Sequence, residues 1–469
     1  MKRTTFILLL IFTLSLNAQF ETTHWMFGTH AGLNFQTVGG VISQNSHIDT
    51  EEGCSSIADM NGNLLFYTDG QTIYDRNHQP MTNGTNLKGD NSSTQSALIV
   101  PKPGNSNLFY VFTSDDGYSS PSTNGINYSV VDITLNNGLG DVIPGQKNIN
   151  LIDKASEKLT GVVSSDGISI WILTLAPRTQ STIIPYLTIG SNFGTFYAFK
   201  LNSNGLDNQA IVSQLPIQID GGVGYIKFSP DGTKIGMANL DDETAYLLDF
   251  DDTTGVVSNP VSIFQNLTEC YGVEFSPDSS KLYISEKNNK IEQFDLDNGN
   301  AMTIINTQQN YRSALQLGPD GKIYQTHTLN YGQGTNKLSV IENPNMAGTA
   351  CNYNYDAISL YSSQQVHQGL PNFVQSNFLH TLGIDNFTQL NNVKMFPNPA
   401  INHINISLPN TNQYNIEIYT LTSQLVLSKS INDTKNVKLN ISKLTRQRYL
   451  LIVKDLKNKR YKTFYLLKK

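Results

Sequence analysis

The chain has 469 residues, of which 39% are hydrophobic, and a net charge of −6 from 32 Lys and Arg against 38 Asp and Glu. The charge is unevenly spread. Residues 391–469 hold 14 basic and 3 acidic residues, a net of +11, whereas the remainder without Lys2 and Arg3 holds 16 and 35, a net of −19. A body this acidic argues against a nucleic-acid partner, because phosphates must be met by Lys and Arg.

The N-terminus has the composition of an export leader. Lys2 and Arg3 precede an apolar run over residues 6–16, and Ala18 provides a small residue at a cleavage position before Gln19. We therefore predict a signal peptide over residues 1–18. The run is shorter than the roughly 20 residues of a membrane span, and no later segment is as apolar, so no transmembrane segment is expected in the mature chain.

Residues 19–382 contain a repeated turn between two strands. The segment at 228–235 (FSPDGTKI) recurs at 275–282 (FSPDSSKL) and, one residue shorter, at 317–324 (LGPDGKIY). Pro presets the first corner of the turn, Asp caps it through its side chain and Gly closes it. Because four short strands fit each 40–45 residues, we predict a β-propeller with almost no helix.

The blade count follows from weaker copies upstream, at residues 58–67, 105–112 and 163–171. Units that begin near residues 54, 97, 158, 222, 270 and 312 make six blades. The first strands, at 25–41, and the segment at 369–375 are left over. We expect these two ends to form one composite blade that hides both edges, which makes seven the preferred count.

The last part of the chain, residues 391–469, has a separate β pattern. Alternating strands at 404–408 and 414–419 follow the opening Phe396-Pro397-Asn398-Pro399, and the chain ends on Lys468-Lys469. Alternation of this kind predicts a small Ig-like β-sandwich, joined through a linker at 383–390. We expect its Lys and Arg on the solvent faces of strands, where they discourage edge pairing.

This tail resembles the type A C-terminal sorting domain of the bacterial type IX secretion system. The motif residues that carry the resemblance are Phe396, Pro397, Asn398, Pro399, Tyr449, Lys468 and Lys469. Residues 444–449 resemble the family's Leu-x-x-Gly-x-Tyr segment, but Gln447 replaces a Gly that tolerates positive φ. The resemblance implies recognition by the secretion machinery, a secreted or outer-surface location, and frequent removal of the tail.

The repeats resemble the Ser-Pro-Asp-Gly class of propellers found in TolB-like, lactonase-like and WD-type proteins. The N-terminal segments at 24–28, 62–70 and 93–97 are similar to those of secreted surface proteins that pair this propeller with a sorting tail. The resemblance implies an architecture and a location, and no particular ligand.

The sequence contains no zinc-protease, nucleophile-elbow, phosphate-loop or Cys-x-x-Cys motif, so no catalytic, cofactor-binding or metal residue is predicted. Asp251-Asp252 and the segment at 295–300 offer oxygen atoms that suit calcium, but blade turns use the same residues and the turn interpretation is preferred. Cys54, Cys270 and Cys351 allow one disulfide, although three small buried side chains are the simpler expectation.

Two classes of function remain open. One is a non-catalytic surface or secreted protein whose propeller binds a protein or glycan, with loop aromatics such as Tyr118, Tyr186, Tyr331 and Tyr353 as surface candidates. The other is a lactonase-like or glycan-cleaving propeller enzyme. The absence of a catalytic motif favours binding, and carboxylates or histidines that converge at the central channel would favour the enzyme.

Overall fold

The computed structural model of the chain separates into two compact units, one over residues 18–379 and one that includes residues 380–469. The described residues are 20–37, 40–117, 124–177, 193–207, 209–265, 269–287, 290–298, 301–306, 311–378, 388–390, 393–420, 425–432, 434–455 and 460–469. The predicted signal peptide, residues 1–18, and residues 383–387 of the predicted linker lie outside them.

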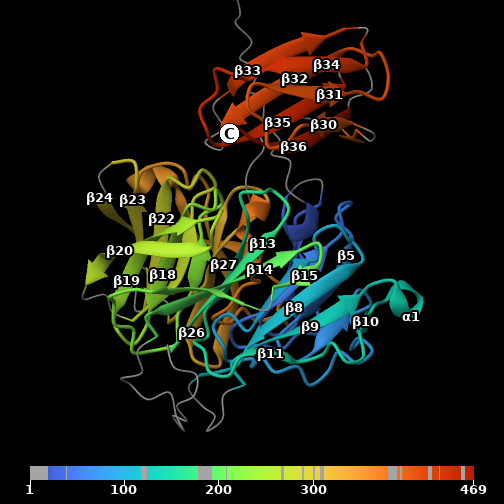
Figure 1. Cartoon of the computed structure of the whole chain (residues 1–469). Coiled ribbons are helices and arrows are strands. Elements are labelled where there is room, and N and C mark those ends of the chain that lie inside the picture. Colours follow the sequence, from blue (N-terminus) through green and yellow to red (C-terminus); the bar gives the residue numbers. More distant parts are fainter. Residues whose placement is uncertain are drawn as a thin grey trace, which may run out of the picture. The chain divides into compact units, whose positions relative to one another are not determined.

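In the first unit the described strands form seven antiparallel sheets that follow one another along the chain (Figure 1). The first four sheets are β1 (His24–Phe27), β2 (Ala31–Asn34) and β3 (Ile42–Ser43); β4 (Ser55–Ala58), β5 (Leu64–Thr68) and β6 (Ile73–Asp75); β7 (Ala97–Pro101), β8 (Leu108–Ser114), β9 (Ile126–Asp132), β10 (Asp141–Val142) and β11 (Ile149–Ile152); and β12 (Leu159–Val163), β13 (Ile170–Ala176), β14 (Thr195–Asn202), β15 (Gly205–Leu206) and β16 (Ile211–Gln214).

The last three sheets have four strands each: β17 (Ile226–Phe228), β18 (Lys234–Asn239), β19 (Thr244–Asp251) and β20 (Val256–Gln265); β21 (Cys270–Phe275), β22 (Lys281–Glu286), β23 (Lys290–Asp295) and β24 (Ala301–Asn306); and β25 (Leu315–Leu317), β26 (Ile323–Asn330), β27 (Gln333–Ile341) and β28 (Tyr353–Ser359). Helical structure in the described residues is limited to short segments: η1 (Phe20–Thr22), α1 (Leu135–Gly138), η2 (Gly348–Cys351) and η3 (Gln375–Phe378). The predicted seven-bladed propeller with almost no helix is confirmed.

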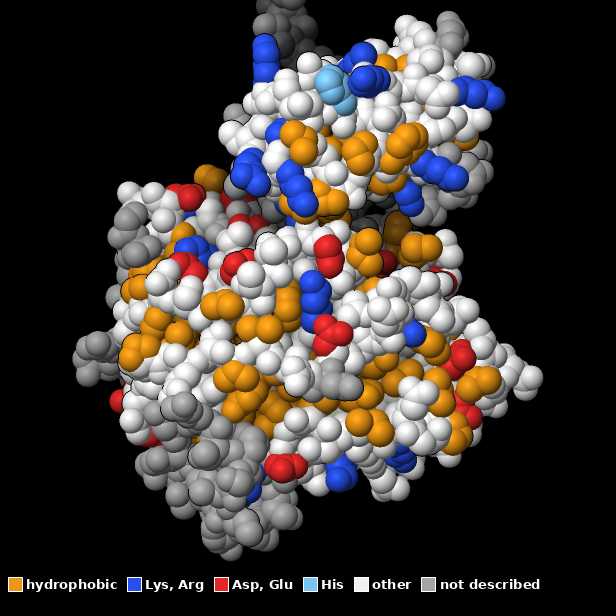
Figure 2. All heavy atoms as spheres, in the orientation of Figure 1, with side chains coloured by type: hydrophobic (Ala, Val, Ile, Leu, Met, Phe, Trp, Pro, Cys, Tyr) orange, Lys and Arg blue, Asp and Glu red, His pale blue; other side chains and the backbone are white. Residues whose placement is uncertain are grey.

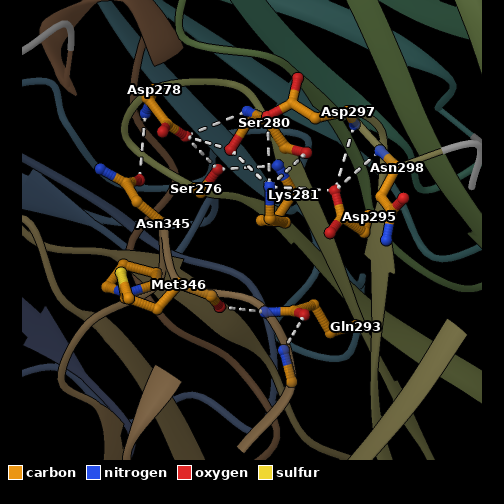
Figure 3. Close-up of polar contacts among 12 residues, drawn as sticks. Ser276, Asp278, Ser280, Lys281, Gln293, Asp295, Asp297, Asn298, Asn345 and Met346 are labelled. Carbon is orange, nitrogen blue, oxygen red and sulfur yellow. Dashed lines mark hydrogen bonds and ion pairs between the residues drawn. The ribbon is translucent and has the colours of Figure 1, made fainter. Parts of the chain in front are cut away.

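Side chains of the repeated motif build the turn between the first two strands in the fifth and sixth blades. In the sixth blade the Ser276 hydroxyl donates to Asp278 Oδ1 at 2.7 Å, and the Lys281 amide donates back to Ser276 Oγ at 2.9 Å (Figure 3). Gly232 takes a left-handed φ of +77° in the fifth blade, and Ser279 takes the same role at +62° in the sixth. The predicted turn chemistry therefore operates in these two blades, with Ser279 in a conformation that Gly adopts more readily.

The two ends of this unit meet where the ring closes. Thr29 and Gln365 exchange backbone hydrogen bonds of 3.0 and 3.1 Å, and Val366 pairs with Thr335 of the seventh blade. Residues 370–374 then run beside the inner strands, with Asn372 donating to the carbonyls of Ala97 and Leu159 at 3.3 and 2.7 Å. This closing segment, residues 365–378, thus joins the N-terminal sheet and lies along the innermost strands of the second, third and fourth blades.

An aromatic cluster seals this junction. Trp25 of β1 lies 5.3 Å from the ring of Tyr324 in the seventh blade and 6.1 Å from Phe373 in the closing segment. Its indole N–H donates to the Thr22 carbonyl, so the polar group of this fully buried side chain has a hydrogen-bond partner.

The second unit is a sandwich of two sheets with its own core. One sheet is β29 (Thr388–Gln389), β36 (Arg460–Leu467), β35 (Arg448–Asp455), β32 (Tyr414–Thr420) and β33 (Leu425–Ile431), and the other is β30 (Lys394–Phe396), β31 (His403–Ser407) and β34 (Asn436–Asn440). Inward side chains such as Ile404, Ile416, Leu439 and Leu451 form the core. Figure 2 shows Lys and Arg side chains gathered on the visible face of this unit.

The three cysteines are free and buried. Cys270 donates its thiol to the Thr244 carbonyl at 2.8 Å, and burial raises its pKa to about 12. The buried-hydrophobe expectation therefore describes them, and the possible disulfide does not form.

Candidate functional site

A belt of hydrogen bonds runs from blade to blade at one end of the central channel. It is formed by the residues at and just before the start of each inner strand. Backbone N–H groups donate from Gly53 to Ser93, Gln95 to Glu157, Glu157 to Gly222, Tyr225 to Tyr271, Ala314 to Gln368 and Gln368 to Glu51, at 2.9–3.2 Å. Between the sixth and seventh blades the hydroxyl of Ser285 completes the belt, accepting from Gly272 and donating to Ser313.

We call this end the channel mouth. Its charged and polar residues come from five blades and from the segment that follows β28: Glu51, Glu52, Thr94, Glu157, Lys158, Tyr271, Arg312 and His367. Residues 371 and 374 pair in parallel with Cys54 and Gly161, so β4 and β12 run in the same direction and start at the same end. Residues far apart in the sequence therefore meet at the mouth.

Two buried acids interact at the mouth. Glu157 Oε2 accepts from the Thr94 backbone N–H at 2.9 Å and its hydroxyl at 2.7 Å, while Glu52 Oε2 accepts from the Tyr271 hydroxyl at 3.0 Å. Burial raises the pKa of both carboxyls, and the repulsion between Glu52 and Glu157 raises the pKa of Glu52 further. Two carboxylic acids in this arrangement retain a proton more readily than a solvated acid does.

Lys158 follows Glu157 in the chain, and its side chain is buried. Its Nζ donates to the carbonyls of Val223, Gly224 and Ala238, each at 2.8 Å, which uses all three of its N–H bonds. Burial lowers its pKa to about 8. The ammonium therefore holds the fourth and fifth blades together at the mouth.

Glu51 fixes the hairpin loop of the seventh blade over the mouth. Its Oε1 accepts from the Gly332 amide at 3.0 Å and from Gln368 Nε2 at 2.9 Å, and its Oε2 lies 3.0 Å from His367 Nδ1. These contacts lower the pKa of Glu51 against the effect of burial. The neighbouring Tyr331, 54% exposed, shares a 3.1 Å hydrogen bond with Ser92.

A cationic and aromatic group extends the mouth toward solvent. The ring of Tyr311 lies 5.2 Å from the Arg312 guanidinium and 5.4 Å from Lys287 Nζ. Glu269 forms ion pairs with both cations, at 3.4 Å for Arg312. These four side chains are partly exposed, so we call them the Tyr311 patch.

The predicted sorting motif is brought together with the end of the chain. Asn398 donates through Nδ2 to the Tyr465 carbonyl at 2.7 Å and accepts the Leu467 N–H at 2.8 Å. Ala400 pairs with Lys468, and the Lys469 N–H donates to the Ala400 carbonyl. Phe396, Pro397 and Pro399 are exposed, and Lys468 is buried, beside this contact.

Tyr449 is buried, and its hydroxyl donates to the Thr445 carbonyl at 3.1 Å, close to the Thr445 hydroxyl at 3.0 Å. Gln447 is not among the described residues with positive φ. The Gly of the family pattern is therefore not needed for positive φ in this turn: Gln447 keeps an ordinary φ, and its carbonyl accepts the Lys468 N–H.

The two sequences that suited calcium are engaged in other contacts. Lys281 Nζ lies 3.0 Å from Asp295 and 3.3 Å from Asp297, between the two carboxylates (Figure 3). Asp251 caps its own turn by accepting the Thr253 amide at 2.9 Å. Gly299 and Asn300 lie outside the described residues, as do the loop aromatics Tyr118 and Tyr186.

The two remaining surface candidates, Tyr331 and Tyr353, lie in different environments. Tyr331 is exposed as expected, whereas the prediction for Tyr353 is wrong: it lies in β28, and its hydroxyl donates to Gln325 at 2.7 Å. The motifs in the sequence do not predict the channel mouth. The available signal was the recurrence of polar residues just before each inner strand, as with Glu52, Thr94 and Glu157.

The comparisons identify the C-terminal unit. Residues 394–466 match the secretion system C-terminal sorting domain. The chain therefore carries a type IX secretion sorting domain that engages the secretion machinery, and the protein is secreted or displayed at the outer-membrane surface. No helix in the described residues has the length and apolarity needed to cross a membrane.

No curated protein matches the sequence. Similar solved structures include a functionally unknown protein from Desulfotomaculum acetoxidans (13% identity, 82% of this chain and 100% of that one, TM-score 0.36). Others are a Bacteroides uniformis protein described as a candidate 6-phosphogluconolactonase (12%, 87% and 96%, 0.35) and Kluyveromyces lactis Hsv2 (10%, 68% and 90%, 0.38). The propeller assignment rests on the sheet topology above.

Proposed function

We propose that the propeller is a non-catalytic binding module, exported through its sorting domain, whose channel mouth recognises a protein or glycan. The observation that carries the proposal is that the buried charged side chains at the mouth form hydrogen bonds within the protein. Lys158 is bonded to three carbonyls, Glu157 to Thr94, and Glu51 to the loop that carries Tyr331. These groups hold blades and loops in place and leave the Tyr311 patch and Tyr331 to meet a ligand.

The chemistry of the exposed groups favours a particular kind of ligand. An aromatic ring flanked by cations, with a second tyrosine nearby, suits stacking on a sugar ring or packing against a protein side chain. The acidic body disfavours a polyanion. A neutral glycan, or a protein surface that presents Lys or Arg, fits this combination.

A second candidate function, the propeller enzyme, rests on Glu52 and Glu157, because carboxylates that converge at the central channel are the feature expected of it. The binding module is preferred because both carboxylates already accept hydrogen bonds from the protein. Burial raises the pKa of Glu52 and of Glu157, the charge of Glu157 raises that of Glu52 further, and Asp116 does the same for Glu157. Buried acids with raised pKa values supply the general acid of many hydrolases. In this alternative one acid protonates the leaving oxygen of a glycoside or lactone.

The test is binding and turnover measured on the same samples of the secreted chain. A panel of neutral polysaccharides, acidic polysaccharides and a basic protein is assayed by interferometry and by analysis of released products. We expect binding without turnover, and at least about 10-fold weaker binding for Tyr311→Ala and Tyr331→Ala, which equals about 1.4 kcal/mol. Ile168→Ala is the matched control, since Ile168 is an exposed apolar residue (63%) in the turn at the other end of β12.

Two results would change the assignment. Turnover that falls about 100-fold in Glu52→Gln or Glu157→Gln would replace the binding module with the enzyme. Unchanged binding in both tyrosine variants would remove the mouth as the recognition face.

A further inference from the structure

The seventh blade contains a second polar constellation, made of residues other than those of the mouth, on strands β26 and β28. His327 lies in β26 and is 7% exposed. Its Nδ1 is 2.8 Å from Asp356 Oδ1, and its Nε2 is 2.7 Å from the Tyr355 hydroxyl. The imidazole is thus held at both nitrogens by two neighbouring residues of another strand.

Two irregularities in the sheet create this arrangement. The pairing of β27 with β28 shifts between Leu338 and Val340, where β28 has extra residues. The pairing of β26 with β27 shifts between Thr326 and Thr328, the interval that contains His327, and again between Thr328 and Asn330. Asp356 takes a φ of +53°, and its N–H donates to Ser339 Oγ. Bulges re-aim side chains, and this one directs Tyr355 and Asp356 onto the same imidazole.

The two contacts of His327 are satisfied together by one neutral tautomer. A carboxylate oxygen accepts, so in that tautomer Nδ1 donates to Asp356 and the lone pair of Nε2 faces the Tyr355 hydroxyl. The Tyr355 hydroxyl therefore donates to Nε2. This is the order carboxylate, imidazole, hydroxyl that activates the nucleophile in acyl-transfer enzymes.

Exposure places the hydroxyl-bearing residue at the boundary with solvent. Tyr355 is 36% exposed, whereas His327 is buried. Burial and the nearby Asp356 raise the pKa of Tyr355, so the phenol keeps its proton at rest. Activation must then occur by proton transfer during attack, which is the task of the lone pair on Nε2.

We propose that Tyr355 is a base-activated nucleophile toward activated carboxylic esters, whose leaving oxygen belongs to a phenol or another acidic hydroxyl, with His327 as its general base and Asp356 as the positioning residue. The phenol oxygen of Tyr355 bonds to the ester carbonyl carbon while its proton moves to His327 Nε2. The bond from that carbon to the leaving oxygen then breaks, and the leaving group takes the proton from Nε2. The products are a tyrosyl ester and the free phenol or acidic alcohol, so the acyl group of the ester becomes covalently attached to the seventh blade.

The test uses p-nitrophenyl acetate as the probe on the full secreted chain. Release of p-nitrophenolate is followed together with the intact mass and peptide mapping of the acetylated residue. We expect Tyr355 to be acetylated at least about 100-fold faster than Tyr361, because a positioned general base contributes roughly that factor or more. Tyr361 is a 53% exposed tyrosine that provides an internal reference in the same molecule.

Three variants assign the roles. Tyr355→Phe should remove the fast phase, and His327→Gln should slow it to the rate of Tyr361. Asp356→Asn should slow it by roughly 10-fold or more, since the amide no longer fixes the tautomer, and Asn tolerates positive φ. Tyr353→Phe on the same strand should leave the rate unchanged.

The ratio of the acetylation rates of Tyr355 and Tyr361 distinguishes loss of the general base from loss of the fold, because unfolding exposes both phenols alike. The thermal unfolding of each variant is measured as well. Equal acetylation of the two tyrosines in the parent chain, or a fast phase that survives His327→Gln, overturns the proposal.

Discussion

A buried ion pair between the fifth and sixth blades offers the sharpest test of how the ring is held together. Lys227 of β17 and Glu274 of β21 are 2.7 Å apart, and neither side chain is exposed. Lys227 also donates to the Leu315 carbonyl at 3.1 Å and to Gln316, while Glu274 Oε2 accepts the Leu317 N–H at 2.8 Å. The pair therefore joins the inner strands of three consecutive blades.

We predict that Lys227→Met destabilises the propeller by about 3–5 kcal/mol, because it leaves Glu274 buried without its partner. Loss of such an amount is a large part of the roughly 5–15 kcal/mol that keeps a domain folded. Lys227→Met combined with Glu274→Leu should recover most of the loss, since two apolar residues leave no uncompensated charge. Lys234→Met is the control: the Lys234–Asp249 pair is about 40% exposed, and its loss should cost less than about 1 kcal/mol.

The pH dependence of Lys227→Met follows from the pKa of Glu274. Burial raises that pKa, and Lys227 opposes the rise, so removing Lys227 raises the folded-state pKa further. A folded pKa above the unfolded value makes the acid's contribution favourable at low pH, and this stability is lost as pH rises through the folded pKa. The difference in the free energy of unfolding between the parent chain and Lys227→Met should therefore grow from pH 5 to pH 7. The increase is at most roughly 3 kcal/mol, since each pH unit contributes at most about 1.36 kcal/mol.

The assay is urea unfolding followed by tryptophan fluorescence. The chain has two tryptophans, Trp25 and Trp171, and both lie in the propeller, so the signal does not include the sorting domain. A loss that is the same at pH 5 and pH 7, or a double variant no more stable than Lys227→Met, would refute the reasoning.

Three further predictions concern the turns, the tail and the thiols. Gly232→Ala should cost about 1–2 kcal/mol in the same unfolding assay, because φ is +77° and the new Cβ would lie 3.2 Å from Val162; a cost near zero would contradict this. Asn398→Ala removes two hydrogen bonds at an exposed position, so it should destabilise the sorting domain by about 1 kcal/mol and speed hydrogen exchange at the Leu467 amide. Asn440→Ala, which is also exposed and loses the bond from the Ser442 N–H, should leave exchange at the Leu467 amide unchanged. The three buried cysteines should react with a thiol reagent only after urea is added, and a thiol that reacts at once would show an exposed site.

The turns of the fifth and sixth blades could be predicted because their chemistry is local. Ser276 and Asp278 are two positions apart, and the bonds that hold the turn lie within residues 276–281, so the motif contains every residue that forms the turn. The mouth could not be predicted in this way. Glu52 and Glu157 are 105 positions apart, and only the parallel run of the inner strands brings them together.

Tyr353 and Gln447 show two further limits of local reasoning. Tyr353 follows a left-handed Asn352 and resembles a loop residue in the sequence, but pairing with Ile341 makes it the first residue of a strand. Gln447 replaces a Gly in the family pattern, yet the turn is held by the Tyr449 hydroxyl and by the Lys468 N–H without positive φ. In both cases a partner distant in sequence or a side-chain bond decides the backbone conformation.

The closing segment links the fold of the propeller to the part of the chain that follows it. Trp25 and Phe373 are separated by 348 positions, yet their rings are in contact, and Gln368 supplies the belt's bonds to the second and seventh blades. Long-range contacts of this kind form only after the intervening chain is ordered, since loop closure costs entropy before the contact is made. The last propeller residues before the sorting domain are therefore the ones that bury Trp25 and complete the belt. The closure of the acidic propeller depends on residues 365–378. The propeller can therefore close only after synthesis of the chain has reached the residues that precede the basic sorting domain.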